Sequence, residues 1–175
     1  MHIKTIITMD FKEWIQEIIK SGNLCSDYTS KVNNAKSNME LIKLCYDANG
    51  ASYLCEMDAK GFPLPYEVIC SRFRPYINGR YIAEYKNEKN NGYTSSLYCC
   101  FNDFDEIQIE TTITTLLGCK SYIRVKENDF VQLYADKNCE LVIDCPPSSR
   151  CNVDFWNGAK ITTTNATRNI VLTKH

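Results

Sequence analysis

The chain has 175 residues, of which 44% are hydrophobic and 23% charged, a composition typical of a folded globular protein. Its 20 basic and 21 acidic residues nearly cancel, so no net field attracts nucleic acid or an anionic membrane. No stretch approaches about 18 consecutive apolar residues, so we expect no membrane-spanning helix. The first nine residues are too short for a secretory signal, which predicts a cytoplasmic protein starting at Met1 or Met9.

The N-terminal segment has the pattern of an amphipathic helix. Residues 10–13 (DFKE) form a capping box, and apolar residues then recur at helical spacing over 11–19. Gly22 is expected to end this helix. A second, more polar helix is predicted over 26–36.

Two more helices follow directly. A capping box at 37–40 (SNME) opens a helix that the turn-forming pair Asn49-Gly50 should stop. A short helix over 52–60 should then be closed by Gly61.

The character of the sequence changes near Asn78-Gly79. A last helix is predicted over 65–74 before this point. Residues 80–86 and 92–101 alternate in polarity and flank a polar loop, which predicts a β-hairpin.

The rest of the chain has the composition of short strands and tight turns. Residues 107–117 are β-branched almost throughout and predict one strand. From Gly118 on, turn residues recur at intervals of about ten positions, as in all-β proteins. The strand-like segments between them are SYIRVK, FVQLYA, ELVIDC, NVDFW, KITTT and IVLTK.

Three of these segments begin alike, with a small, a polar and an aliphatic residue, at Cys139, Cys151 and Ala159. This predicts a degenerate repeat of about ten residues. We expect an α+β fold in which a helical subdomain, 1–77, packs on a β-rich subdomain, 78–175. Tight turns favour an antiparallel meander or sandwich for the β half, and a short β-solenoid is the alternative.

The ten cysteines are expected to be reduced and buried. The chain lacks a secretory signal and is long enough to fold without staples. Disulfides and metal ligation are the alternatives, but no CxxC knuckle occurs, and Cys139, Cys145 and Cys151 are six apart. The acidic run at 102–106 is read as a solvated turn. No metal site and no cofactor are predicted.

Catalysis is not expected. The only histidines are His2 and His175, at termini that are usually mobile, so a positioned imidazole for a Ser–His or Cys–His pair is missing. No nucleotide-binding glycine motif occurs, and no sequence feature pairs the carboxylates that a glycosidase needs. We therefore predict no catalytic residue.

Tyrosine is abundant, with eleven copies, and it clusters around the predicted hairpin. Tyrosine covers a large contact area while keeping a polar tip, so it is frequent at interfaces. Cross-strand packing on a half-buried sheet is the alternative reading. The candidate binding residues are Tyr76, Tyr81, Tyr85, Tyr93 and Tyr98.

The segments SGNLCSDY, YDANGASYLCEMDAKGFPLPYE, YINGRYIAEY and NGYTSSLYCC resemble small uncharacterised proteins of gut anaerobic bacteria and their bacteriophages. The resemblance implies a viral or mobile-element context, a non-enzymatic role, and a place in the host cytoplasm or the virion. It assigns no functional residue.

We predict a non-catalytic structural or protein-interaction protein that binds a protein partner or itself. One alternative is a small-molecule or glycan-binding β module. Another is a phage inhibitor of a host defence protein.

Overall fold

The computed structural model describes residues 11–20, 26–37, 40, 44, 48–61, 81–87, 93–99, 105–164 and 168–175. Three helices have their bounds within these ranges: α1 (Phe11–Lys20), α2 (Ser26–Asn34) and α4 (Ala48–Ala59). The first two were predicted, and they pack against each other. The helix predicted over 65–74 lies outside the described residues. None of the described helices is long and apolar enough to cross a membrane.

The predicted N-cap at Ser37 is confirmed, whereas the reciprocal bond of the capping box forms with Lys36 in place of Ser37. The Glu40 N–H donates to Ser37 Oγ at 3.2 Å. The Glu40 carboxylate in turn accepts the Lys36 N–H at 2.7 Å. The first contact satisfies a backbone donor that a helix start leaves without an intrahelical partner, and the second satisfies the N–H of the residue before the cap.

The prediction that Asn49-Gly50 ends a helix is wrong, because α4 begins at Ala48 and runs through both residues. Turn propensity is a weak preference that packing overrides, and α4 packs Cys55 and Met57 fully out of solvent. The predicted end of this helix is confirmed. Gly61 takes a φ of +92° and donates its N–H to the Asp58 carbonyl at 3.1 Å.

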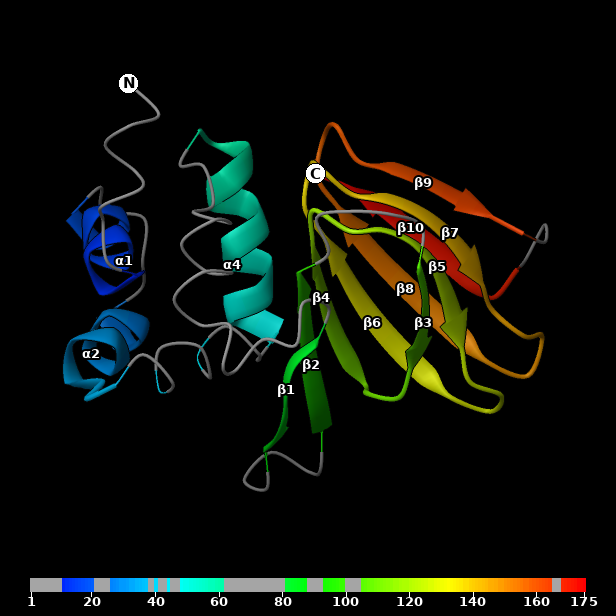
Figure 1. Ribbon diagram of the computed structural model, residues 1–175, viewed down its shortest axis with the longest axis horizontal. Coiled ribbons are helices and arrows are strands. Elements are labelled where there is room, and N and C mark those ends of the chain that lie inside the picture. The colour runs from blue at the N-terminus through cyan, green and yellow to red at the C-terminus, as the bar shows by residue number, and fades with distance from the viewer. Residues whose placement is uncertain are drawn as a thin grey trace.

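The described part of the chain contains ten strands, which form two sheets (Figure 1). Sheet A has the order β1-β2-β4-β6-β8-β10, and sheet B has the order β3-β5-β7-β9. The strands of sheet A are β1 (Tyr81–Asn87), β2 (Tyr93–Cys99), β4 (Ile113–Leu117), β6 (Phe130–Ala135), β8 (Arg150–Phe155) and β10 (Ile170–Lys174). The strands of sheet B are β3 (Asp105–Ile109), β5 (Lys120–Val125), β7 (Glu140–Asp144) and β9 (Lys160–Thr163).

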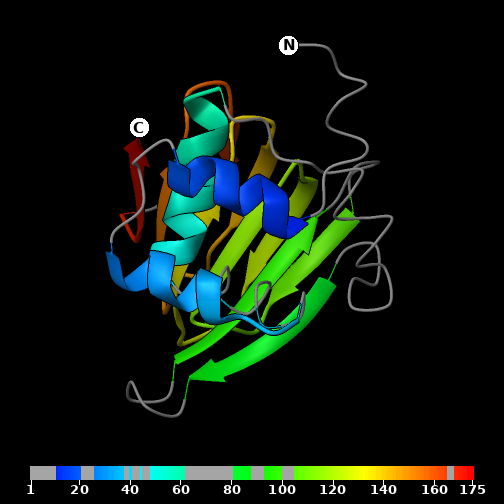
Figure 2. The same cartoon turned by 90° about the vertical axis from the view of Figure 1, so that its left-hand side faces the viewer.

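From β2 onward the chain is a β-solenoid, because successive strands alternate between the two sheets and all their pairings are parallel. Ile123 pairs with Ile143, and Ile143 pairs with Thr163, so one full coil takes 20 residues here. The predicted ten-residue spacing of strands therefore corresponds to half a coil. The described helices all lie to one side of this solenoid (Figures 1 and 2).

The expected helical half packed on an antiparallel meander is wrong, and the solenoid alternative describes the β region. A tight turn was read as a hairpin turn that returns the chain beside the strand just left. Here each turn instead carries the chain across to the opposite sheet. Among the strands that the structure describes, β1 and β2 alone pair antiparallel, as the predicted hairpin required.

The single strand predicted over 107–117 is also wrong, because β3 ends at Ile109 and β4 begins at Ile113. Thr111 makes the corner between them. Its hydroxyl donates to the Ile113 carbonyl at 3.1 Å and lies 3.0 Å from the Thr114 hydroxyl. Such local bonds from threonine compete with strand pairing, so a β-branched run does not ensure one continuous strand.

Alternate residues of both sheets face one shared interior and form a single core. The burial pattern of β6, β7 and β8 alternates strictly at its start, as expected for strands with one inward face. The fully or nearly fully buried members are Ile107, Ile109, Leu116, Cys119, Ile123, Val125, Val131, Leu133, Ala135, Cys139, Leu141, Ile143, Cys145, Cys151 and Val153.

The described cysteines are buried free thiols, as predicted: Cys55, Cys119, Cys139, Cys145 and Cys151. Cys119, Cys139 and Ala159 occupy equivalent corner positions. The Glu140 N–H donates to the Cys119 carbonyl, and the Lys160 N–H donates to the Cys139 carbonyl, each at 2.9 Å. Small side chains at these positions let successive corners stack closely.

Gly158 tests this close stacking. It has a φ of +117°, and a Cβ added there would lie 2.9 Å from the Lys137 carbonyl oxygen of the preceding corner. Gly158→Ala should lower the free energy of unfolding by about 2 kcal/mol or more, because backbone strain and a clash act together. Urea denaturation measures the loss.

Gly61→Ala is the matched control. Gly61 also has a positive φ, but a Cβ there would meet nothing within 4 Å. It should cost only the strain, about 1 kcal/mol. Equal losses for the two variants would contradict close packing between these corners.

Candidate functional site

The most extensive polar network described surrounds Asp136, the first residue of the turn between β6 and β7. Its side chain is fully buried. Asp136 Oδ1 accepts hydrogen bonds from the Gly118 N–H at 2.9 Å, the Asn138 N–H at 3.3 Å and the Cys139 thiol at 3.1 Å. The bond from Gly118 ties this corner to the preceding coil. Aspartate suits the position because its short acceptor side chain reaches backbone donors in a turn.

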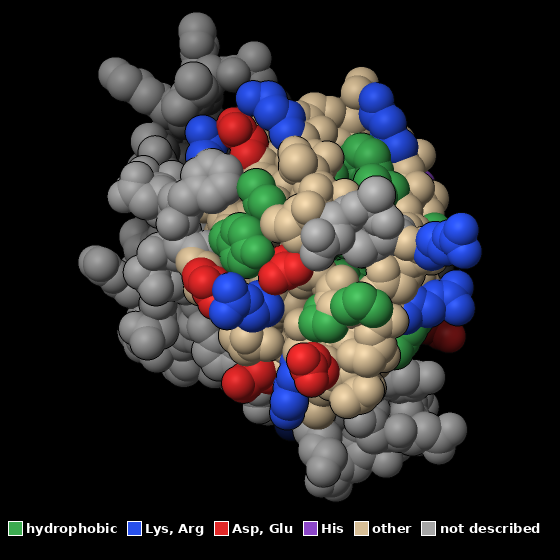
Figure 3. Space-filling view, turned by 90° about the vertical axis from the view of Figure 1, so that its right-hand side faces the viewer, with side chains coloured by type: hydrophobic (Ala, Val, Ile, Leu, Met, Phe, Trp, Pro, Cys, Tyr) green, Lys and Arg blue, Asp and Glu red, His purple; other side chains and the backbone are tan. Residues whose placement is uncertain are grey.

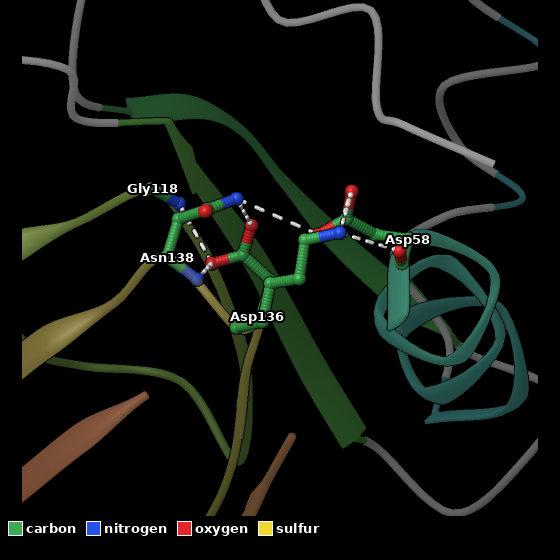
Figure 4. A network of polar contacts seen from close by, with 5 residues as sticks. Asp58, Gly118, Asp136 and Asn138 are labelled. Atoms are coloured by element: carbon green, nitrogen blue, oxygen red, sulfur yellow. Dashed lines mark hydrogen bonds and ion pairs between the residues drawn. The ribbon is translucent and has the colours of Figure 1, made fainter. Parts of the chain in front are cut away.

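The same corner binds the end of α4 (Figure 4). Lys137 Nζ donates to the Asp58 carbonyl at 2.7 Å and lies 3.4 Å from Asp58 Oδ1. Asn138 Nδ2 lies 3.5 Å from Asp58 Oδ2 and 3.3 Å from Asp136 Oδ2. A lysine at a helix C-terminus also complements the negative end of the helix dipole. We call Asp58, Asp136, Lys137 and Asn138 the corner latch.

Burial shifts the pKa values of ionisable groups in and beside the corner latch. Burial raises the pKa of the Asp136 carboxyl, and the nearby Asp58 raises it further, while the bonds from Gly118 and Cys139 oppose the rise. Burial likewise raises the pKa values of the Cys55 and Cys139 thiols. A thiol with a raised pKa stays protonated and is a poor nucleophile and metal ligand. Among the described residues, no group of three or more His, Cys, Asp or Glu could hold a metal ion.

α4 covers the outer surface of sheet A beside this latch. It packs against β4 and β6. Thr115 and Leu117 alternate with inward-facing Leu116, yet both are fully buried, so α4 shields this part of the outer face. Burial raises the pKa of Tyr134, which faces outward on the next strand, and Asp154 raises it further.

His175 is held against the outer face of sheet A, contrary to the prediction of an unpositioned imidazole. Its Nε2 lies 2.8 Å from Asp154 Oδ1, and its ring stacks on Trp156 with 4.8 Å between centroids. Gln132 Nε2 donates to Asp154 Oδ2 at 2.6 Å. Strand alternation over residues 170–175 was the signal in the sequence that could have located His175, since it places His175 on the same face as Thr173. In the structure, Thr173 is the register partner of Asp154.

The predicted tyrosine cluster is brought together only in part. Tyr81 pairs with Tyr98 across β1 and β2, Tyr85 pairs with Ser95, and Tyr93 lies opposite Asn87. Tyr98 is half-buried and packs against the core, which fits the alternative reading of structural packing. Tyr76 lies outside the described residues. The binding role of the cluster stays a prediction.

The outer face of sheet B is open and carries a regular pattern. Its outward residues are exposed or half-buried on all four strands. Tyr122 and Val142, neighbours in the central row, lie between two charged rows. One row is Lys120–Glu140–Lys160, with ion pairs of 3.3 and 3.4 Å. The other row is Gln108–Arg124–Asp144, and its Arg124 pairs with Glu106, the neighbour of Tyr122 in the central row, at 3.1 Å.

The charged rows of this face set local pKa values. The pKa of the Glu140 carboxyl is lowered, first by its bond from Lys120 and then by the charges of Lys120 and Lys160. The guanidinium of Arg124 lies 5.8 Å from the centroid of the Tyr122 ring. We call these outward residues of β3, β5, β7 and β9 the sheet B face. Glu106, part of the run read as a solvated turn, belongs to this face.

The corner latch predicts a stability loss for Lys137→Met. The variant keeps the apolar stem but removes the ammonium that bonds the α4 carbonyl and the buried Asp58. We expect the free energy of unfolding to fall by about 1–3 kcal/mol in urea denaturation. Lys126→Met, at an exposed lysine of another corner, should change it by less than about 0.5 kcal/mol. Similar losses in both would contradict the latch.

The buried carboxyl of Asp136 predicts a pH dependence. Its ordinary pKa is 3.8, and the folded state raises it. Its contribution to stability is therefore present below that value and is lost as pH rises through the folded pKa. Asp136→Asn removes this titration, so stability relative to wild type should shift in favour of the variant as the pH rises above 3.8.

Urea denaturation at several pH values measures this shift. Glu127→Gln, at an exposed turn carboxylate, is the control and should follow the wild-type profile. Parallel profiles for Asp136→Asn and wild type would contradict a raised Asp136 pKa.

In comparisons with known proteins, no protein-family model, no curated protein and no solved structure matches the chain.

Proposed function

We propose that the protein is a non-catalytic interaction module that binds a folded protein partner through the sheet B face. The observation that carries this proposal is the asymmetry of the solenoid. α4 covers the outer side of sheet A at β4 and β6, whereas the outward residues of sheet B are all exposed or half-buried.

The composition of the sheet B face supports a protein partner. Its centre combines Tyr122 and Val142, and charged rows flank this centre on both sides. Protein interfaces commonly have such an apolar centre with a polar rim. Tyrosine and arginine contribute most often to binding hot spots, and Tyr122 and Arg124 lie together here.

The regular spacing of the charges supports specificity. Parallel strands hold neighbouring side chains about 4.8 Å apart along each row. The signs alternate from Lys120 to Glu140 to Lys160. A rigid pattern of this kind favours partners with the complementary pattern and disfavours others.

The glycan-binding reading, the phage-associated setting and the inhibition of a host defence protein stay predictions. The first rests on the tyrosines around β1 and β2, of which Tyr98 is engaged in packing.

The test compares two double variants of the full chain. Tyr122→Ala with Arg124→Ala removes the centre of the sheet B face. Phe130→Ala with Arg150→Ala removes an exposed aromatic and an exposed arginine that pair on sheet A. Cross-linking and affinity capture from the cells that encode the protein, together with light scattering for self-association, give the readout.

We expect wild type and the sheet A variant to retain one stoichiometric partner, and the sheet B variant to bind it at least about tenfold more weakly. Equal retention by both variants would contradict the assignment of the face. A strict monomer that retains no partner would contradict the function.

A further inference from the structure

The last coil of the solenoid has two strand edges without a neighbour among the described residues, because β9 ends sheet B and β10 ends sheet A. The N–H groups of Lys160 and Thr164 donate back toward β7, to the Cys139 and Ile143 carbonyls, at 2.9 and 3.0 Å. Alternate residues of a parallel strand bond to opposite sides. Ile161 and Thr163 therefore direct their N–H and C=O groups to the open edge of β9.

The inward side of this coil is incompletely covered. Leu172 pairs with the fully buried Val153 and so occupies an inward position, yet it is 45% exposed. Ile161 and Ile170 pack against the core but are only partly buried. Figure 3 shows this end of the molecule, with separate hydrophobic side chains among both basic and acidic ones. The last coil thus has apolar residues at the inward positions, as an interior coil does, but no further coil covers them among the described residues.

The charge of the last coil is uniformly basic. Residues 160–175 include Lys160, Arg168 and Lys174 but no Asp or Glu, and all three cations are exposed. Lys160 is also the last member of the row Lys120–Glu140–Lys160, whose signs alternate. The position beyond Lys160 therefore favours a carboxylate.

We propose that the open edge of β9 accepts an extended strand from a partner protein, in which acidic residues alternate with apolar ones. This inference rests on the proposed function and names a second contact of the same partner class. The added strand would bond to Ile161 and Thr163, direct a carboxylate toward Lys160 and cover Leu172 with its apolar residues. Strand addition to a sheet edge takes its affinity from main-chain bonds and its specificity from alternate side chains.

β7 shows which sequence suits this edge, since it already pairs with β9 on the other side. Glu140 lies beside Lys160, and Leu141 lies beside Ile161. A strand with the pattern of β7, shifted one coil further, repeats these contacts on the open side.

A second copy of this chain fits the edge less well. β3 (DEIQI) has the acidic and alternating pattern, but Ile107 and Ile109 are buried in their own core and are not free to cover another one. Two copies of the last coil, placed edge to edge, would bring their cations together. The observations therefore favour a different protein.

The probe is a fluorescent peptide of residues 138–146 with Cys139→Ser and Cys145→Ser. A control peptide carries Glu140→Lys and Asp144→Lys in addition. Binding to the full chain is followed by fluorescence anisotropy, and protection of the Ile161 and Thr163 amides is followed by hydrogen exchange. We expect the acidic peptide to bind at least about tenfold more tightly than the lysine peptide.

Two variants of the protein sharpen the test. Thr163→Pro removes one N–H that faces the open edge while leaving the pairing with β7, since edge strands tolerate such a proline. Lys160→Glu reverses the charge. Each should weaken the acidic peptide at least about tenfold, and Lys160→Glu should favour the lysine peptide. Lys126→Glu, a distant exposed lysine, should leave binding unchanged. Circular dichroism establishes that each variant is folded.

Equal binding of the two peptides, or full binding to folded Thr163→Pro, would overturn the proposal. Self-association that Thr163→Pro abolishes would also overturn it, because the occupant would then be a second copy. The sheet B variant distinguishes failure of this inference from failure of the proposed function. If its partner binding is lost while the edge fails to bind peptide, the proposed function stands and this inference falls.

Discussion

In-register parallel pairing between successive coils constrains the whole solenoid, because each coil must place the same positions inward. The column Ile123–Ile143–Thr163 runs through three strands of sheet B. A shift of one residue in any strand would exchange its inward and outward sides. The turns must therefore hold the length of each coil, and side chains do this by bonding to the preceding coil. Asp136 accepts from Gly118, and Asn169 Nδ2 donates to the Pro146 carbonyl at 2.7 Å.

The helical part depends on the same corners. Lys137 and Asn138 belong to the turn that Asp136 organises, and they also hold the end of α4 at Asp58. A single turn thus sets the coil length and attaches the helix. Since α4 then covers sheet A at β4 and β6, we place the proposed interaction face on the opposite sheet. Coil stacking, helix attachment and the choice of interaction face are linked through four residues.

The sequence predicted the local structure well and the pairing poorly. Alternation and turn residues located the strands after Gly118, and the caps at Ser37 and Gly61 formed as expected. Pairing could not be derived, because a tight turn can return the chain within one sheet or carry it to the opposite one, and both leave the same local pattern. Small residues recur every 20 positions at Cys119, Cys139 and Ala159, but the turn residues recur about every ten positions and made the shorter spacing easier to see.

The candidate sites depended on distant contacts in the same way. Asn138 bonds to both Asp136 and Asp58, although Asp58 lies far away along the chain. Nothing in the sequence around Asp136 indicates this contact. Tyr98, selected for its residue type, contributes to the core. Composition identified residue types typical of interfaces, whereas the outward positions of Tyr122 and Arg124 follow from the alternation of β5 and its pairing with β7.

The lysines of the last coil also affect whether copies of the protein associate through their open ends. A solenoid with an open end is a template on which identical coils can stack without limit, and natural sheet proteins protect such edges with charged side chains. Lys160 and Lys174 are exposed on β9 and β10, so two copies that meet through their last coils repel each other at low ionic strength. Dissolved salt screens this repulsion over about 8 Å at physiological concentration. The same charge that we propose to attract one acidic foreign strand therefore also disfavours pairing between two identical ends.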